Sequence, residues 1–145
     1  MAKETFRGSI PVHLLYDVEN DVWVRREESG AVTVGATSYG AYFAGEILAF
    51  TPKRPGAEIE RGRSLGVVEV AKTMVAIHSP LSLRLSAIND AAIADPALIN
   101  ADPYGKGWLV RGEPLRWETE RTRLVPYGTY EQHVIGVQPG AEILR

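Results

Sequence analysis

The amino-acid sequence predicts a mainly β fold: two sheets packed as a sandwich or forming a flattened barrel, with short helices at the periphery. Three observations predict it. Short apolar segments follow a period of two, 14 glycines and 9 prolines interrupt them at short intervals, and helical patterns are few. At 145 residues, the chain has the size of one ordinary domain that buries a single core without covalent staples.

The composition excludes several classes of function. There is no cysteine, which excludes disulfides, cysteine-based metal sites and a thiol nucleophile. The 16 basic and 18 acidic residues are interspersed, which argues against the broad basic surface of a nucleic-acid binder. The first residues lack an apolar segment followed by a cleavage site, and no apolar run approaches the length of a membrane span. We therefore expect a cytoplasmic protein without nucleic-acid or membrane partners.

Strands account for most of the predicted elements. The first two, at 21–25 and 31–35, are joined by a polar stretch ending in Gly30, where a hairpin turn needs a glycine. A third, at 46–51, ends before Pro52, which has no N–H to donate to a ladder. The remaining strands are predicted at 65–70, 73–78 and 81–88.

Helices are predicted at 38–43, 89–100 and 129–135. Ser38 is the expected N-cap of the first helix and Gly45 its expected end. In the second, Pro96 must lie in a first turn or split the helix, because proline breaks a helix interior. We expect one domain over residues 1–136, followed by a C-terminal tail at 137–145.

The most informative segment is a predicted hairpin around Lys72. Two β-rich arms of nearly equal length flank Ala71 and Lys72. If the arms pair, the Lys72 ammonium projects into water from a rigid turn, as a covalently attached mobile group requires. Glu69, three residues earlier, matches the pattern by which lipoate-attaching enzymes find their target. The alternative for Lys72 is an ordinary solvated lysine in a turn, and the alternative for Glu69 is an ordinary carboxylate on a strand.

Longer motifs resemble the H protein of the glycine cleavage system. Residues 16–25, Tyr-Asp-Val-Glu-Asn-Asp-Val-Trp-Val-Arg, are similar to the family's opening segment with one residue inserted. Residues 66–72, Gly-Val-Val-Glu-Val-Ala-Lys, align without a gap on its lipoyl-lysine hairpin. The strongest match is 100–109, Asn-Ala-Asp-Pro-Tyr-Gly-Lys-Gly-Trp-Leu, whose Asp102, Tyr104 and Trp108 we expect to be structural. The similarity covers roughly residues 16–135.

The resemblance implies a lipoyl-domain fold of the barrel-sandwich hybrid type and a non-enzymatic carrier. It implies lipoic acid in an amide link to Lys72, with Glu69 serving recognition by lipoate-attaching enzymes. The attached dithiolane would undergo thiol–disulfide exchange at partner enzymes.

The sequence departs from the family next to the lysine. The family's polar Ser-Asp pair is replaced by Val75 and Ala76, and its later glycine by Leu83. A more apolar surface favours different partners. The resemblance is therefore closest to the H-protein-like lipoate-binding proteins of the heterodisulfide-reductase-like sulfur-oxidation system, in which the carrier holds sulfur intermediates. The alternatives are a glycine cleavage H protein carrying an aminomethyl group, and an H-like protein that relays lipoyl groups.

Other classes of function fit less well. A biotin carrier has methionines on both sides of its lysine, whereas Ala71 and Thr73 flank Lys72. The three histidines show no metal-ligand spacing, and we expect His78 to be a half-buried structural residue. No acid–base pair is recognisable, so no catalytic or metal-binding residues are predicted. A binding module without cofactor stays open.

Overall fold

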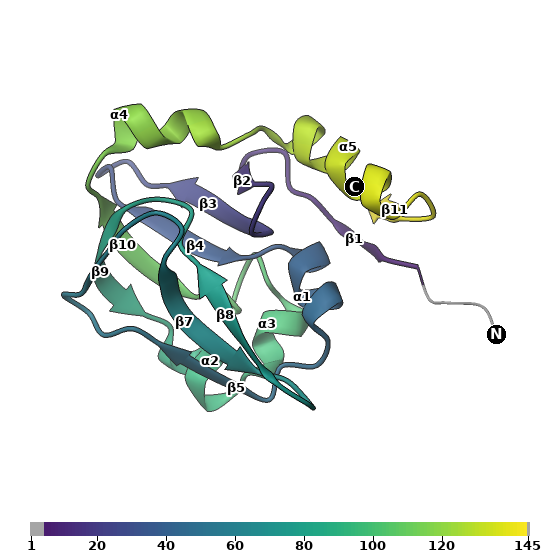
Figure 1. The fold of residues 1–145 in the computed structure, drawn as a ribbon, viewed down its shortest axis with the longest axis horizontal. Helices are drawn as coiled ribbons and strands as arrows, with labels where there is room; N and C mark the ends of the chain where they lie inside the picture. The colour runs from purple at the N-terminus through teal and green to yellow at the C-terminus, as the bar shows by residue number, and fades with distance from the viewer. Residues whose placement is uncertain (1–4, 145) are drawn as a thin grey trace.

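The computed structural model describes residues 5–144, which form a two-sheet sandwich rather than a closed barrel (Figure 1). The larger sheet has six strands, in the spatial order β2 (Leu15–Asp17), β3 (Val22–Arg26), β4 (Val32–Ala36), β10 (Val110–Pro114), β9 (Leu83–Ile88) and β6 (Glu58–Ile59). The smaller sheet has three, in the order β5 (Ala49–Pro52), β7 (Ser64–Glu69) and β8 (Met74–His78). The predicted mainly β class is confirmed.

The main core lies between these two sheets. Val24 and Val34 of the larger sheet belong to one buried cluster with Phe50, Leu65 and Val68 of the smaller sheet. Burial of each such side chain contributes on the order of 1.5–3 kcal/mol. On β9 the period-two pattern corresponds to alternation between this core and solvent, whereas β3 and β4 are buried on both faces.

A second apolar cluster lies under the helix α5 (Tyr127–Val137). Its centre is a stacked pair of rings, Tyr16 and Tyr130, with centroids 4.7 Å apart. Trp23 on β3 joins the same cluster. Because Trp23 and Val24 point to opposite faces of β3, this strand contributes to both clusters and joins α5 to the sandwich.

The chain ends differently from the predicted tail. Strand β11 (Glu142–Leu144) pairs in parallel with the N-terminal strand β1 (Arg7–Ser9), as the upper right of Figure 1 shows. The Phe6 N–H donates to Oε1 of Gln138 over 2.6 Å, and Ile143 packs against the second cluster. The local pattern gave no sign of this pairing, because the partner strand lies at the other end of the chain.

The helices lie at the periphery, as predicted, with corrected boundaries. In α1 (Ser38–Ala44) the N-cap is Thr37 and not Ser38: the Thr37 hydroxyl accepts from the Gly40 N–H, while the Ser38 hydroxyl donates to the Ser9 carbonyl. Gly45 ends the helix with φ +92°, as expected. Pro96 splits the predicted helix 89–100 into two. The remaining helices are α2 (Asp90–Ala94), α3 (Ala97–Ala101), α4 (Trp117–Glu120) and the 3₁₀ turn η1 (Arg121–Arg123).

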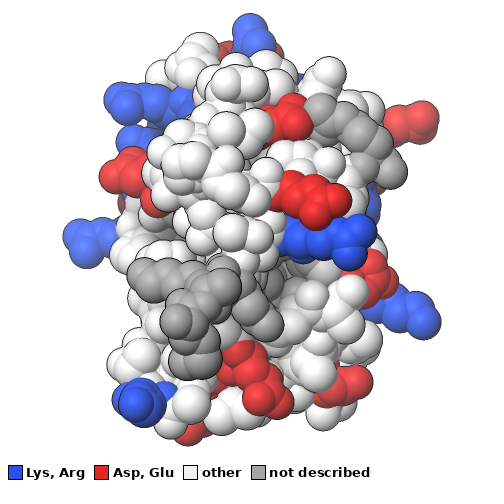
Figure 2. Space-filling model, turned by 90° about the vertical axis from the view of Figure 1, so that its right-hand side faces the viewer, with Lys and Arg blue, Asp and Glu red and all other residues white. Residues whose placement is uncertain are grey.

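Charges are mixed on the molecular surface that Figure 2 shows, where basic and acidic side chains are interspersed among uncharged residues. Five exposed ion pairs, such as Arg84 with Glu58, join residues of opposite sign within the described chain. Between residues 5 and 144, no helix has both the length and the apolar content needed to cross a bilayer.

Candidate functional site

Lys72 lies in the turn of the β7–β8 hairpin. Glu69 is paired with Met74, and the Val70 N–H donates to the Thr73 carbonyl over 2.9 Å. These pairs leave Ala71 and Lys72 as a two-residue turn. The Lys72 side chain is exposed and makes no ion pair with any other described residue. The predicted place of this lysine in the fold is therefore confirmed.

The smaller sheet holds the base of this turn. β7 is its central strand and pairs with β8 on one side and β5 on the other. The Leu48 N–H extends the β5 side by donating to the Glu69 carbonyl over 2.7 Å. Because the ladders reach the last residue before the turn, hydrogen bonds fix the backbone below Lys72, while its side chain is exposed.

Glu69 ends β7 with its side chain exposed. Val68 before it is buried in the core, so the alternation of the strand places the Glu69 carboxylate on the solvent side of the sheet. Within the described residues it has no hydrogen-bonding or ionic partner. A protein approaching the turn can therefore contact this carboxylate and Lys72 together.

An open groove of about 260 Å³ lies beside the turn. One wall is the hairpin, through Val70, Ala71 and Lys72, and the other is the connection from α1 to β5, through Gly45, Glu46 and Leu48. Both Glu46 and Leu48 are exposed. The lysine amine thus stands at the edge of a groove with one apolar and one acidic side chain on its far wall.

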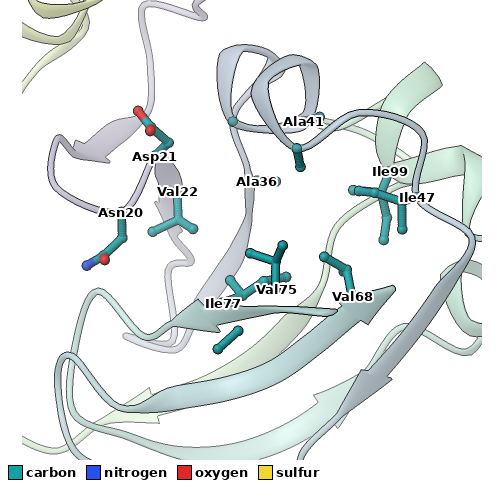
Figure 3. Close-up of a pocket in the computed structure, with 13 residues that line it drawn as sticks. Asn20, Asp21, Val22, Ala36, Ala41, Ile47, Val68, Val75, Ile77 and Ile99 are labelled. Atoms are coloured by element: carbon teal, nitrogen blue, oxygen red, sulfur yellow. The ribbon is translucent and has the colours of Figure 1, made fainter. Parts of the chain in front are cut away.

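A second cavity, of about 90 Å³, extends from the hairpin towards β3 (Figure 3). In Figure 3, Val68, Val75 and Ile77 of the hairpin lie below the cavity, and Ala41 of α1 lies above it. Its lining is mainly apolar, and Asp21 is its one charged residue. The other lining residues are Asn20, Val22, Ala36, Gly40, Ala44, Ile47, Ala76 and Ile99.

Asp21 is positioned at the margin of this cavity by the second cluster. The Tyr130 hydroxyl donates to Oδ1 of Asp21 over 2.8 Å and lies 2.7 Å from the Thr37 hydroxyl. Burial raises the pKa of the Asp21 carboxyl above its ordinary value, and the hydrogen bond from Tyr130 partly opposes that rise. Burial likewise raises the pKa of Tyr130. The phenol therefore stays protonated as a donor.

A model of the glycine cleavage H-protein family matches residues 14–135. Glycine cleavage system H protein 5 of Aquifex aeolicus is 34% identical over 120 residues, which cover 80% of each chain. The H protein of Mycolicibacterium vanbaalenii is 36% identical over 113 residues, 78% of this chain and 83% of that protein. The chain belongs to the glycine cleavage H-protein family.

A solved structure supports the same assignment at the level of the fold. The crystal structure of a glycine cleavage system H protein from Mycobacterium marinum superposes with a TM-score of 0.73 at 29% identity, covering 85% of this chain and 97% of that one. H proteins are lipoyl carriers, and their cofactor is lipoic acid bound covalently to a lysine. An exposed lysine on a rigid turn beside an open groove fits that cofactor.

The longest H-protein motif, residues 100–109, does not line the groove beside Lys72, but its hydrogen bonds stabilise one wall of that groove. Oδ1 of Asn100 accepts from the Ile47 N–H over 3.0 Å, and its Nδ2 donates to the Gly45 carbonyl over 2.9 Å. The Trp23 indole donates to the Pro103 carbonyl over 3.0 Å. Asn100 therefore fixes the connection that forms the far wall beside Lys72. The role of this asparagine was not predicted, because its partners lie more than 50 positions away.

The residues expected to be structural in this motif make such contacts. The Tyr104 hydroxyl donates to the Ser9 carbonyl over 2.7 Å, and Asp102 accepts from the Lys106 N–H over 2.9 Å. Trp108 packs against the second cluster.

His78 differs from the expectation, since it is exposed rather than half-buried. Its Nδ1 lies 2.7 Å from the Gly62 carbonyl. Strand β8 is at the edge of its sheet, which explains this exposure. Among residues 5–144, no group of three or more histidine and acidic side chains could hold a metal ion.

Proposed function

We propose that this chain is a non-catalytic carrier that holds lipoic acid in an amide link to Lys72 and presents it to partner enzymes. The observation that supports the proposal best is the place of Lys72, which is exposed in a two-residue turn and has no ionic partner in the part of the chain that the structure describes. Glu69 is proposed as the carboxylate that lipoate-attaching enzymes recognise. Its exposure three residues before the lysine supports this role. A cytoplasmic location stays a prediction.

The proposed cargo is the aminomethyl group of the glycine cleavage reaction, and the proposed partners are the enzymes of that system. The family relationship supports this assignment better than the sulfur-oxidation role expected from the sequence, because the relatives described above are glycine cleavage H proteins. Lipoic acid, when bound, supplies a dithiolane that exchanges thiols and disulfides and holds a group on sulfur.

The chain's own residues supply location and protection. The turn fixes the attachment point, and the two cavities, which share Ala44 of α1, provide surfaces beside the hairpin. Amide formation removes the charge of the Lys72 ammonium, so the modified side chain is uncharged and consists of two aliphatic chains joined by one amide group. Val75 and Ile77 offer it an apolar surface.

The experiment that tests this proposal is intact-mass measurement of protein made in a lipoate-supplied host. We expect a lipoyl increment on the wild-type chain and on Lys106→Arg, and none on Lys72→Arg. Lys106 is a suitable control because it is also an exposed lysine in a turn, but that turn does not join two strands of a hairpin. An unmodified wild-type chain in the presence of an active lipoate ligase would refute the assignment, as would an increment that survives in Lys72→Arg.

Sulfur oxidation remains the second candidate because one observation favours it. Met74, Val75 and Ala76 are all exposed and apolar. Where the family has a polar Ser-Asp pair, this chain has Val75 and Ala76, which favours a different partner enzyme. A reconstituted glycine cleavage assay separates the two roles. Turnover with the lipoylated chain supports the glycine cleavage carrier. Absence of turnover, together with stimulation of a heterodisulfide-reductase-like complex, supports the second role, and stimulation of neither supports a lipoyl relay.

A further inference from the structure

Exposed apolar side chains gather around Lys72. Among the described residues, nine large apolar side chains are exposed, and four of them lie one residue before the end of α1, on the α1–β5 connection or at the start of β8. These four are Phe43, Leu48, Met74 and Val75. Phe43 is 77% exposed, Met74 62% and Leu48 51%. We call these four residues, with Glu46 and Glu69, the arm-side surface.

The two walls of the groove bring these side chains together. Leu48 lines the groove together with Lys72, and Ala44, which follows Phe43, lines both cavities. Met74 is paired with Glu69 directly below the turn. Leu48 and Met74 therefore lie beside the attachment point, and Phe43 is adjacent in sequence to the groove lining; a gathered apolar patch of this kind marks an interaction site.

Strand β8 adds an unprotected edge to this surface. Val70 and Thr73 are hydrogen-bonded to each other, so the alternation of an antiparallel ladder turns the backbone groups of Met74 and Ala76 away from β7. β8 is the last strand of its sheet and contains neither proline nor a Lys, Arg, Asp or Glu side chain. Edge strands normally have such features because a bare apolar edge attracts other chains. An edge without them is typical of a strand that a partner covers.

The charges beside Lys72 indicate which side chains a partner would offer at this surface. Glu46 and Glu69 are exposed and have no ionic partner in the described chain, and the nearest cation in the groove is Lys72. Acylation of Lys72 abolishes that positive charge and leaves the two carboxylates uncompensated. The modified form therefore presents an apolar surface with an acidic margin.

We propose that the arm-side surface is the docking site for an enzyme that acts on the attached lipoyl group, and that this enzyme offers an apolar centre with a basic rim. The proposal rests on the proposed function, because the partner is defined by the group on Lys72. It adds the chemistry of the contact and a preference for the modified form: the loss of one cation strengthens attraction to a basic rim.

Binding of the lipoylated chain to purified partners tests the apolar contact. The probes are the glycine decarboxylase of a glycine cleavage system and a heterodisulfide-reductase-like complex, and the partner that binds the wild-type chain more tightly is used. We expect Phe43→Ser and Met74→Ser each to weaken binding about tenfold, or ~1.4 kcal/mol. Val12→Ser is the matched control, since Val12 is 61% exposed and lies between β1 and β2, where it shares a hollow with Leu144 and with no residue of the hairpin. It should leave the Kd unchanged.

The charge contribution has its own variants. Glu46→Gln should weaken binding and reduce its dependence on salt concentration, whereas Glu28→Gln, an exposed carboxylate in the β3–β4 turn, should do neither. The lipoylated chain should bind more tightly than the unlipoylated chain.

The outcomes separate this proposal from the proposed function. Intact mass reports lipoylation independently of binding, so an unmodified Lys72 refutes the carrier itself. The docking proposal is overturned by a fully lipoylated chain that binds neither probe. It is also overturned if Phe43→Ser and Met74→Ser, with unchanged melting temperatures, bind like the wild type, or if self-association of the chain proves to cover the surface.

Discussion

Lys72 suits the proposed attachment of lipoic acid, because its amine makes no ion pair with any other residue between 5 and 144 and its neighbours hold the backbone. The ladder below the turn fixes its backbone, and the groove beside it leaves the side chain accessible. Glu69 is similarly unrestrained, in contrast to Glu27, whose hydrogen bonds from Arg25 and Thr33 lower its pKa. At the residue scale, the residue proposed for modification and the residue proposed for recognition both have charged groups that make no ion pair with another described residue.

Glu69→Gln is expected to slow lipoylation while leaving the fold intact. The substitution removes the exposed carboxylate but keeps the size of the side chain, so the recognising enzyme loses a charged contact that costs about tenfold, or ~1.4 kcal/mol. The measurement is the initial rate of lipoyl incorporation by a purified ligase. Glu28→Gln should react like the wild type, and an equal rate for Glu69→Gln would show that this carboxylate is not recognised.

Asp21→Asn is expected to increase stability at neutral pH. Burial raises the pKa of Asp21, so ionisation destabilises the folded state as the pH rises past the unfolded-state pKa of about 3.9. Asparagine still accepts from Tyr130, and it tolerates the φ of +55° at this position. The free energy of unfolding in urea should therefore exceed that of the wild type at pH 7, and the difference should disappear as the pH falls towards 3. A variant less stable than the wild type at pH 7 would contradict this account.

At the scale of elements, the close approach of a side chain to the backbone can require a residue that strand propensity alone would disfavour. Gly35 lies in the interior of β4, where glycine is intrinsically unfavourable. A Cβ at this position would lie 2.5 Å from the Trp23 indole, which packs across β4 while donating to Pro103. One glycine thereby permits the contact that joins strand β3 to the 100–109 segment.

Gly35→Ala should therefore destabilise the fold by roughly 1–3 kcal/mol through overpacking against Trp23. Denaturant unfolding followed by the fluorescence of tryptophan measures the effect. Gly128→Ala is the control, because a Cβ there meets nothing within 4 Å and alanine favours the helix α5. The account fails if both alanine variants are as stable as the wild type.

At the scale of the whole molecule, two apolar clusters stabilise different parts of the fold. The cluster between the sheets supports the hairpin with Lys72, and the cluster under α5 holds β1, β11 and the Asp21 network. Trp23 and Val24, neighbours on β3, belong to different clusters and couple the two. Residues 142–144 were predicted as part of a tail. They instead contribute to the second cluster and not to the cluster between the sheets.

A chain that ends after Val137 should keep its lipoylation but lose order at the N-terminus. The truncation removes β11 and the Gln138 side chain that accepts from the Phe6 N–H, so the amides of β1 lose their partners. Hydrogen exchange should become faster in residues 6–9 and stay unchanged in β7. Loss of lipoylation in the truncated chain would show instead that the two clusters fold as one unit.

The sequence by itself determined the features that depend on neighbouring residues. Alternation predicted β3, β4, β7, β8 and β9, Gly45 predicted the end of α1, and Pro96 predicted the break between α2 and α3. The turn at Lys72 followed from the equal arms around it, and the family from the 66–72 and 100–109 motifs. All of these signals are encoded within a few positions of one another.

Only the tertiary structure decided the features that join distant segments. The parallel pairing of β1 with β11, the contact of Asn100 with the groove wall and the network of Asp21, Thr37 and Tyr130 each connect residues more than 50 positions apart. Side chains of this kind meet only when the sheets pack, and their own sequence neighbours contain no trace of the partner. The place of Lys72 is therefore a local property of the sequence, whereas the surface that surrounds it is a property of the fold.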